Sequence, residues 1–392
     1  MRSYSEALLK SMQIEHTHRI QTIRWLHVGF VFTGAGTTLL ACLLPTLSTM
    51  WHMNDERAGV LFAAQFSGSA LGALLVGTNF HASVVRGYLL LIGSAASISF
   101  FPHFSQVLRF LVFGLGLGLT MTATSMLIGT MYAGRRGRAL SFLNGFWTIG
   151  AALCPEIAVL WVRRWPPTYL FLALAVAMSM VFVLVVHPAS AFAGPVALVD
   201  KVQAEYKDWH LIVVFAALGA LYVGVETSIS GWLMTYVHRL PFVNRLWAPI
   251  ATSFFWIALL CGRMIAPAVL LRVSEAQLLN TSLAIALTST ILLLLSHSPI
   301  TITLTVAAAG LVLGPIFPLC LAKALASLND SPKAKWVFSI SGIGGAIFPW
   351  ITGILSAHEG SLRAGLLVPV FALGAMMLLN RLESAGRWRT IA

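Results

Sequence analysis

Charge is scarce in this sequence. Asp, Glu, Lys and Arg together make up 10% of the 392 residues, and only 13 residues are acidic, whereas roughly a quarter of the residues in a soluble globular protein are charged. Hydrophobic residues make up 58%. At about 20 apolar residues for each membrane crossing, this content suffices for about twelve crossings. The composition argues against a soluble enzyme and predicts an all-α, multi-pass membrane protein.

The shortage of acidic residues leaves a formal net charge of +12. A nucleic-acid-binding module would gather its Lys and Arg on one solvated face, but in this sequence they lie between apolar runs. That distribution follows the positive-inside rule for cytoplasmic loops. We therefore expect membrane lipid as a partner and no nucleic acid.

Cysteine is scarce as well. The four cysteines lie far apart in apolar runs, without a C-x-x-C pair and without a histidine at ligand spacing. We predict no disulfide, no metal site and no cofactor. The polar start of the chain leads into an apolar run without an A-x-A-like cleavage site, so we expect that run to remain as a helix and not to be cleaved as a signal peptide.

Apolar runs between the charged residues predict twelve transmembrane helices. They also divide the chain into an N-terminal cytoplasmic segment (1–24), a six-helix half (25–186), a polar linker (187–210), a second six-helix half (211–380) and a tail (381–392). The predicted spans are 25–47, 58–78, 87–101, 104–132, 139–162, 167–186, 211–237, 246–271, 276–296, 299–322, 336–357 and 364–380.

The charge of the loops predicts the sidedness of these spans. Seventeen Lys and Arg residues lie in the N-terminal segment, the even-numbered loops and the tail, against six in the odd-numbered loops. Because positive charge marks cytoplasmic loops, both termini are expected in the cytoplasm, which requires an even number of helices. We expect a multi-pass protein of the cell inner (plasma) membrane, present as a monomer.

Glycines match between the two halves in the same order. A shift of 190 residues aligns Gly34 with Gly224 and Gly72 with Gly262, and slightly larger shifts align three more pairs in the fourth and fifth spans. The ordered agreement predicts two six-helix pseudo-repeats, a plan in which the solute binds between the halves near the membrane midplane. The three further pairs are Gly114 with Gly310, Gly118 with Gly314 and Gly150 with Gly344.

Four charged residues lie inside predicted spans, where a charge costs roughly 2.5 to 3.5 kcal/mol even on a lenient insertion scale. Glu226 lies near mid-depth, where transporters bind solutes and coupling ions, so we expect it to act in proton coupling and solute binding. The alternative is a protonated acid that only hydrogen-bonds to a neighbouring helix. Tyr222 and Ser230, one turn before and after it, share its helix face.

The other three intramembrane charges have more structural interpretations. Arg109 and Glu156 lie at similar depth in consecutive spans, which predicts an ion pair that either holds and gates the helices or takes part in proton coupling. Arg163 and Arg164 would compete for Glu156. Arg263 is expected to snorkel or to cap a neighbouring helix at the cytoplasmic side.

Polar and aromatic residues near mid-depth predict a solute pocket. A sugar site needs amides and hydroxyls for the ring hydroxyls and flat aromatic faces for the C–H surface of the ring, although any single aromatic residue here is more often a packing residue. Gln65 and Asn144 are the stronger candidates, because an amide in lipid needs a partner. The predicted solute-binding residues are Thr37, Gln65, Asn144, Trp147, Tyr222, Glu226, Trp232 and Trp256.

Several short motifs resemble those of the major facilitator superfamily, and the resemblance extends over the whole chain. The stretch from Gly77 to Arg86 is similar to the family's G-x-x-x-D-x-x-G-R-[RK] loop, with His81 in place of the Asp. Arg109 with Gly114 resembles its R-x-x-x-x-G element. The antiporter motif G-x-x-x-G-P is matched only in part, so it does not indicate efflux.

Within that superfamily, three segments look like the fucose, galactose and glucose proton symporter group. They are Tyr222-Val-Gly-Val-Glu226, Phe255-Trp256 ahead of Gly262-Arg263, and Gly314-Pro-Ile-Phe-Pro318. The resemblance implies a twelve-helix transporter with acids in the first and fourth helices. This chain has no acidic residue in those two helices. Any proton coupling would therefore use a different residue, and Glu226 is the best candidate.

These observations predict a secondary active transporter that moves a sugar or similar small hydroxylated solute by alternating access. The coupling ion is open between a proton, through Glu226, and sodium. The alternative transport function is export of amphipathic drugs or lipids. An intramembrane enzyme would need a convergent nucleophile and base or a metal cluster, which the spans do not offer, and a non-transporting sensor stays open as a further alternative.

Overall fold

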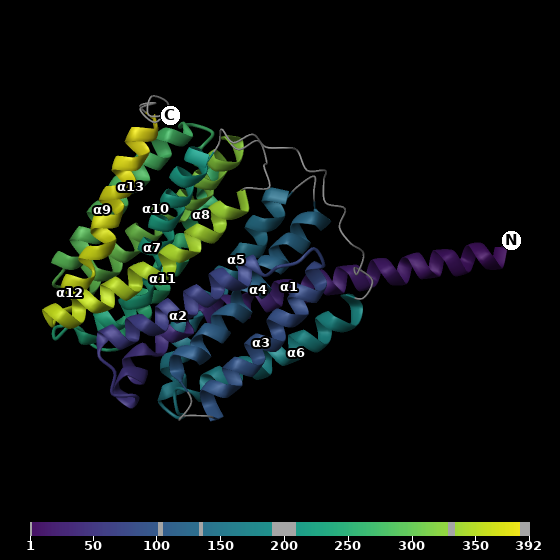
Figure 1. Ribbon diagram of the computed structural model, residues 1–392, viewed down its shortest axis with the longest axis horizontal. Coiled ribbons are helices and arrows are strands. Elements are labelled where there is room, and N and C mark those ends of the chain that lie inside the picture. Colours follow the sequence, from purple (N-terminus) through teal and green to yellow (C-terminus); the bar gives the residue numbers. More distant parts are fainter. Residues whose placement is uncertain (1, 101–104, 133–135, 190–208, 328–333, 385–392) are drawn as a thin grey trace.

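The structure is a bundle of α-helices (Figure 1). The computed structural model describes residues 2–100, 105–132, 136–189, 209–327 and 334–384, with side chains placed for 21–100, 105–132, 138–185, 213–320 and 340–382. Every regular element in these ranges is a helix, which confirms the predicted all-α class. The helices are α1 (Arg2–Met50), α2 (Asp55–Leu74), α3 (Phe80–Phe100), α4 (Gln106–Met131), α5 (Arg136–Val162), α6 (Tyr169–Ala189), α7 (Trp209–Arg239), α8 (Trp247–Val269), α9 (Glu275–Leu295), α10 (Pro299–Ser327), α11 (Ala334–Glu359), α12 (Leu362–Gly365) and α13 (Leu367–Ser384).

Each predicted span falls on a helix, but not all of the helices are equally suited to lipid. Among the described residues, ten helical segments are long and apolar enough to cross a membrane, and α12 with α13 forms one of them, Leu362–Leu382. The apolar part of α6 is shorter, Tyr169–Val185. α2 is not among the ten; it begins with the charged residues Asp55, Glu56 and Arg57.

Two predicted boundaries move. α1 runs without a break from Arg2, so the predicted N-terminal segment is continuous with the first membrane helix and projects from the bundle (Figure 1). α3 begins at Phe80 and not at residue 87, because the Asn79 side chain accepts a hydrogen bond from the Ala82 backbone N–H at 3.0 Å and caps the helix start. Much of the predicted linker (190–208) and tail (385–392) lies outside the described residues.

The same helix pairs pack in the two halves of the chain. In the first half α1 packs on α5 and α6, α2 on α4, and α3 on α4 and α6. In the second half α7 packs on α11 and α13, α8 on α10, and α9 on α10 and α13. Adding six to each number in the first set gives the second, with α13 in twelfth place. The two halves meet along α2 with α11, α5 with α8, and α1 with α7.

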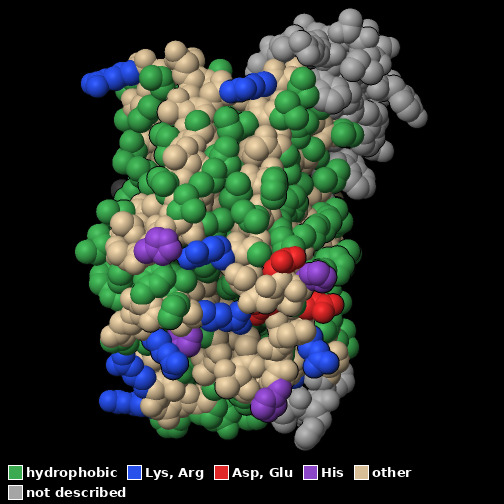
Figure 2. Space-filling model, turned by 90° about the vertical axis from the view of Figure 1, so that its left-hand side faces the viewer, with side chains coloured by type: hydrophobic (Ala, Val, Ile, Leu, Met, Phe, Trp, Pro, Cys, Tyr) green, Lys and Arg blue, Asp and Glu red, His purple; other side chains and the backbone are tan. Residues whose placement is uncertain are grey.

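The outer surface of the bundle is largely hydrophobic. Figure 2, which views the molecule from the left-hand side of Figure 1, shows hydrophobic side chains over much of the upper part, most of the charged and histidine side chains in the lower part, and further basic side chains at the top edge. Leu304 on α10 and Phe371 on α13 are 64% and 73% exposed. Apolar exposure on this scale is what a lipid-facing surface requires.

Glycines let the helices within each half approach closely. A Cβ atom on Gly114 of α4 would overlap the backbone carbonyl of Gln65 on α2, and one on Gly310 of α10 would overlap that of Phe255 on α8. Backbone cannot move aside as a flexible side chain can, so these contacts need glycine. The contact at Gly114 also sets the position of Gln65.

We expect Gly114→Ala to destabilise the fold, because the added methyl group must push α2 away from α4. The melting temperature of the detergent-purified protein should fall by several degrees, the size of shift that a loss of about 1 to 3 kcal/mol produces. Gly93→Ala on α3 is the matched control, since a Cβ there would meet nothing within 4 Å. Equal melting temperatures for the two variants would contradict the close contact.

Candidate functional site

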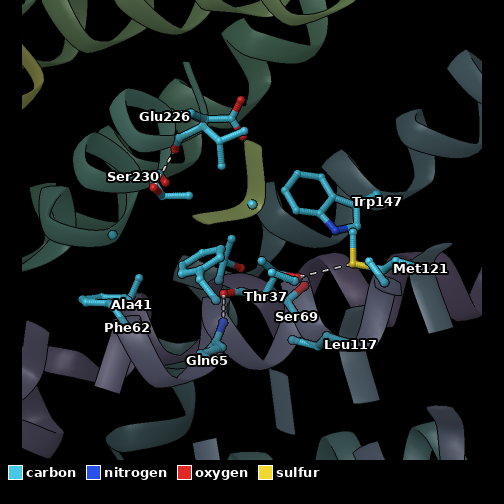
Figure 3. A pocket seen from close by; sticks show the side chains of 18 of the residues that line it. Thr37, Ala41, Phe62, Gln65, Ser69, Leu117, Met121, Trp147, Glu226 and Ser230 are labelled. Atoms are coloured by element: carbon cyan, nitrogen blue, oxygen red, sulfur yellow. Dashed lines mark hydrogen bonds between the residues drawn. The ribbon is translucent and has the colours of Figure 1, made fainter. Parts of the chain in front are cut away.

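A central cavity of about 280 Å³ lies between the two halves (Figure 3). α1, α2, α4 and α5 line it from the first half, and α7, α8 and α11 line it from the second. Figure 3 shows Glu226 and Ser230 on one side and Gln65, Ser69 and Leu117 on the opposite side. Five of the eight predicted solute-binding residues line this cavity: Thr37, Gln65, Trp147, Glu226 and Trp256.

Gln65 provides the amide of the cavity. It is 1% exposed, and its Nε2 donates a hydrogen bond to the backbone carbonyl of Thr37 at 2.9 Å. Its Oε1 is buried and has no partner among the described residues. A buried acceptor left without a donor costs roughly 1 to 3 kcal/mol, and a hydroxyl group of a bound solute can supply the missing bond.

Two tryptophans, one from each half, form the aromatic wall. The rings of Trp147 (α5) and Trp256 (α8) meet edge to face with centroids 5.4 Å apart. Both are buried, and the indole N–H of each lacks a partner within the described part of the chain. The wall thus brings two unpaired indole N–H groups to the cavity lining, together with flat apolar ring faces that suit a sugar ring.

Glu226 is the acidic group of the cavity. Its Oε2 accepts a short hydrogen bond from the Tyr222 hydroxyl one turn earlier on α7. The Nη2 atom of Arg263 on α8 lies 3.6 Å from the same oxygen. The Tyr222 ring stacks on Phe317 of α10, with centroids 5.4 Å apart, which fixes the hydroxyl in place. The carboxylate is therefore held from two helices, and neither holding group lines the cavity.

The expectation that Arg263 snorkels or caps a helix is wrong. Its guanidinium turns inward to Glu226, and its side chain is only 21% exposed. The physical reason is that an acid and a base buried at similar depth on adjacent helices stabilise each other more than either is stabilised by reaching the membrane surface. The spacing of Glu226 and Arg263 in the sequence does not show this, because it depends on how α7 packs on α8.

The expected ion pair between Arg109 and Glu156 is also wrong. Arg109 is 3% exposed, and its Nη1 donates to the backbone carbonyls of Ser97 and Ile98 at 3.0 and 3.3 Å. These carbonyls belong to the last turn of α3, where helix carbonyls lack intrahelical partners. Glu156 is exposed on α5, and it is absent from the ion pairs formed among the described residues. Arg109 thus has a structural contact far from Glu226.

Three predicted solute-binding residues lie outside the cavity lining. Asn144 is exposed, and its amide donates to the Leu140 carbonyl of its own helix. Tyr222 bonds to the Glu226 carboxylate from one turn earlier on α7 and does not itself line the cavity. Trp232 is fully buried, packs on Phe62 with ring centroids 5.6 Å apart, and donates its indole N–H to the Pro349 carbonyl at 3.0 Å. Its place is the contact of α7 with α2 and α11.

The sequence interpretation missed one face of α2. Phe62, Phe66 and Ser69 line the cavity together with Gln65. Phe62 and Ser69 lie three residues before and four residues after Gln65. Phe66 lies four residues after Phe62, so helical spacing is the signal that would have found them. Met121 was missed as well; its sulfur accepts a 3.9 Å contact from the Thr37 hydroxyl.

We call the end of the bundle at which α1, α5, α7 and α11 finish the distal end. An ion pair joins the two halves there. Both carboxylate oxygens of Asp55 (α2) accept hydrogen bonds from Arg239 (α7) at 2.7 Å, and Ser356 (α11) donates a third at 2.6 Å. Asp55 is buried. The tie joins α2 of the first half to two helices of the second, on the distal side of the central cavity.

A second cavity, of about 350 Å³, lies near this tie, and we call it the distal cavity. It continues the direction of the central cavity, since its lining comes from later turns of α1 and α7. Between the two cavities, the Ser253 hydroxyl of α8 donates to the Ala152 carbonyl of α5 at 2.8 Å. The lining residues are Cys42, Pro45, Thr46, Ala158, Val159, Val162, Arg163, Met234, His238, Arg245 and Leu246.

We expect Asp55→Asn to loosen the distal end. Removing one charge of the pair costs roughly 1 kcal/mol after discounting for the exposure of Arg239, so opening should become about fivefold more frequent. The readout is the rate at which N-ethylmaleimide alkylates Cys42, a buried free thiol of the distal cavity. The exposed Cys261 is first replaced by Ser, and the modified peptide is identified by mass spectrometry.

Glu56→Gln is the matched control, because it removes one negative charge from the neighbouring, exposed position. Its alkylation rate should equal that of the parent protein. The same rate in Asp55→Asn and Glu56→Gln would show that the ion pair does not hold the distal end closed.

Comparison with known proteins agrees with this arrangement. Residues 26–333 match the family model of the Major Facilitator Superfamily. Among curated proteins, "Bypass of stop codon protein 6" of Saccharomyces cerevisiae is 23% identical over 393 aligned positions, which cover 87% of this chain and 78% of that protein. "Protein TsgA homolog" of Erwinia tasmaniensis is 28% identical over 270 positions, which cover 66% of this chain and 68% of the relative.

Solved structures share the fold at low sequence identity. The crystal structure of the E. coli fucose:proton symporter superposes with a TM-score of 0.62 at 14% identity, covering 92% of this chain and 97% of that one. A structure of a Major Facilitator Superfamily transporter in the outward conformation superposes with a TM-score of 0.61 at 16% identity over the same shares. The family match spans most of the chain, and the protein therefore belongs to the major facilitator superfamily of multi-pass membrane transporters.

Proposed function

We propose that this protein is a secondary active transporter that moves a sugar or a similar small hydroxylated solute across the inner membrane by alternating access. The observation that carries the proposal is the central cavity, in which the buried Oε1 of Gln65 and the indole N–H groups of Trp147 and Trp256 lack partners among the described residues. A solute with several hydroxyl groups can donate to the first and accept from the others.

The size of the cavity favours a small solute over the alternative of exporting amphipathic drugs or lipids. At about 280 Å³ it lies just below the range of roughly 300 to 1,000 Å³ found for small-molecule sites. The fucose:proton symporter, which shares the fold, is named for a sugar. At 14% identity the substrate class of this chain rests on the cavity and not on that likeness.

We infer further that the two halves are pseudo-repeats and that both termini are cytoplasmic. The matching helix contacts of the two halves support the repeat, and so does the close approach of Gly114 and Gly310 to corresponding neighbours, α2 and α8. The seventeen-to-six division of basic residues supports the orientation. In that orientation the distal end faces outward, and the Asp55–Arg239 tie closes the outer side.

For coupling, we infer that Glu226 carries the transported proton. Its carboxylate borders the cavity and attracts Arg263 only while it is ionised. Protonation removes that attraction and leaves a carboxyl group that can still bond to Tyr222. The contact between α7 and α8 beside the cavity thus depends on whether Glu226 holds the proton. A coupled transporter needs at least one such contact whose strength changes when the proton binds.

Glu226→Gln should abolish proton-driven accumulation, because the amide keeps the shape of the side chain but cannot gain or lose the proton. The measurement is uptake of labelled sugars into proteoliposomes with an imposed pH gradient. Wild-type protein should accumulate at least one labelled sugar above its external concentration, and the variant should only equilibrate it.

Glu56→Gln, the same Glu→Gln change at an exposed position outside the cavity lining, is the control for general damage and should retain accumulation. Accumulation of the same size in Glu226→Gln would remove the coupling role of Glu226. If the wild-type protein responds to a sodium gradient but not to a pH gradient, sodium is the coupling ion. If neither gradient drives any sugar, the proposed solute class fails.

Two tryptophan variants separate solute binding from folding. Trp256→Phe removes an indole N–H that has no partner among the described residues, so stability should change little, while affinity for a transported sugar should fall by roughly tenfold, the effect of one lost hydrogen bond. Trp232→Phe removes the indole hydrogen bond to the Pro349 carbonyl from a fully buried side chain. It should lower the melting temperature and leave affinity unchanged. Calorimetric titration and thermal unfolding measure both, and reversed results would place the site elsewhere.

A further inference from the structure

The distal cavity has a basic lining. Arg163 comes from the end of α5 in the first half, while His238 of α7 and Arg245 of the connection to α8 come from the second half. None of the described residues that line this cavity is acidic. The remaining walls are mostly apolar, from side chains such as Val159, Val162 and Leu246.

The positive charges of this lining are not neutralised by the described part of the protein. Arg163 and Arg245 do not take part in its ion pairs. Arg239, which lies near enough to act on His238 together with Arg245, is already occupied by Asp55. Arg163 and Arg245 are exposed residues at the border of this cavity, so solvent screens their mutual repulsion, and an anion that lies between them gains from both charges.

We infer that the distal cavity binds a small anion through Arg163 and Arg245, with His238 as a further donor. The chemistry that fits is a carboxylate or a phosphate group, because guanidinium groups bond such groups in pairs. A volume of about 350 Å³ accommodates a molecule of sugar-acid size. The same group can come from a free solute or from the headgroup of an anionic lipid whose chains lie along the apolar wall.

Binding here would join the halves. Arg163 and Arg245 belong to opposite halves, as do the two partners of the neighbouring Asp55–Arg239 pair. An anion held by both arginines adds a second link across the distal end and favours the closed arrangement of that end. The site is separate from Glu226 and does not depend on which solute the central cavity carries.

The test is calorimetric titration of the full-length protein in a non-ionic detergent with gluconate and with inorganic phosphate, in wild type and in Arg163→Gln/Arg245→Gln. The double variant should bind these anions at least tenfold more weakly, since each charge-assisted hydrogen bond contributes about that factor. Arg164→Gln is the matched control, because Arg164 is adjacent and exposed but does not line the cavity, and its affinity should match wild type. Glu226→Gln should also bind normally, which separates this site from the transport proposal.

A second arm identifies the source of the anion. The protein is placed in nanodiscs that contain phosphatidylglycerol and phosphatidylcholine. It is then released from the nanodiscs, and the lipid molecules that stay bound to it are counted by native mass spectrometry. Loss of phosphatidylglycerol from the double variant but not from Arg164→Gln would assign a lipid headgroup, and loss of gluconate or phosphate affinity would assign a free anion. If the double variant, with an unchanged melting temperature, retains both kinds of ligand as wild type does, or wild type binds neither, the inference is overturned.

Discussion

A charge that is removed from water must find a partner, and this constraint governs the arrangement of the bundle. The chain has only 13 acidic residues, and three of its buried charges are stabilised by three different kinds of partner. Glu226 is held by Tyr222 and Arg263, Arg109 bonds to the carbonyls at the end of α3, and Asp55 pairs with Arg239. In each case helix packing has brought the partners together. Glu226 borders the central cavity, and the Asp55–Arg239 pair lies near the distal cavity.

The structure also depends on the contacts between its two halves, which differ from the contacts within each half. Within each half, glycines bring backbones into contact and leave little freedom. Between the halves several contacts involve side chains, such as Trp147 on Trp256, Ser253 to the Ala152 carbonyl, and Asp55 with Arg239, although Gly353 of α11 also lies against the backbone of α2 at Asp55. Side-chain contacts can be exchanged for others without deforming a helix, whereas the glycine contacts cannot. The central cavity lies in the space between the two halves.

Much of the architecture could be predicted from the sequence. Apolar runs separated by basic residues located the helices, and the limits of charge in lipid singled out Glu226 and Gln65 as residues that need a function or a partner. Glycines that match between the halves in the sequence, such as Gly114 and Gly310, lie at close helix contacts in the structure. The predicted pairing of Arg109 with Glu156 failed, because similar depth on two helices does not say which way either side chain turns.

The sequence by itself determined the class of the protein, the positions of its membrane helices and the presence of one acid at mid-depth, because these follow from the free energy of placing each residue in lipid or in water. Tertiary structure alone decided that Arg263 faces Glu226, that Asn144 and Trp232 lie outside the central cavity, and that Asp55 meets Arg239 across 184 positions of chain. Those contacts depend on the rotation of each helix about its axis and on which helices are neighbours. Both are set by packing summed over the whole bundle, and no local stretch of sequence contains that information.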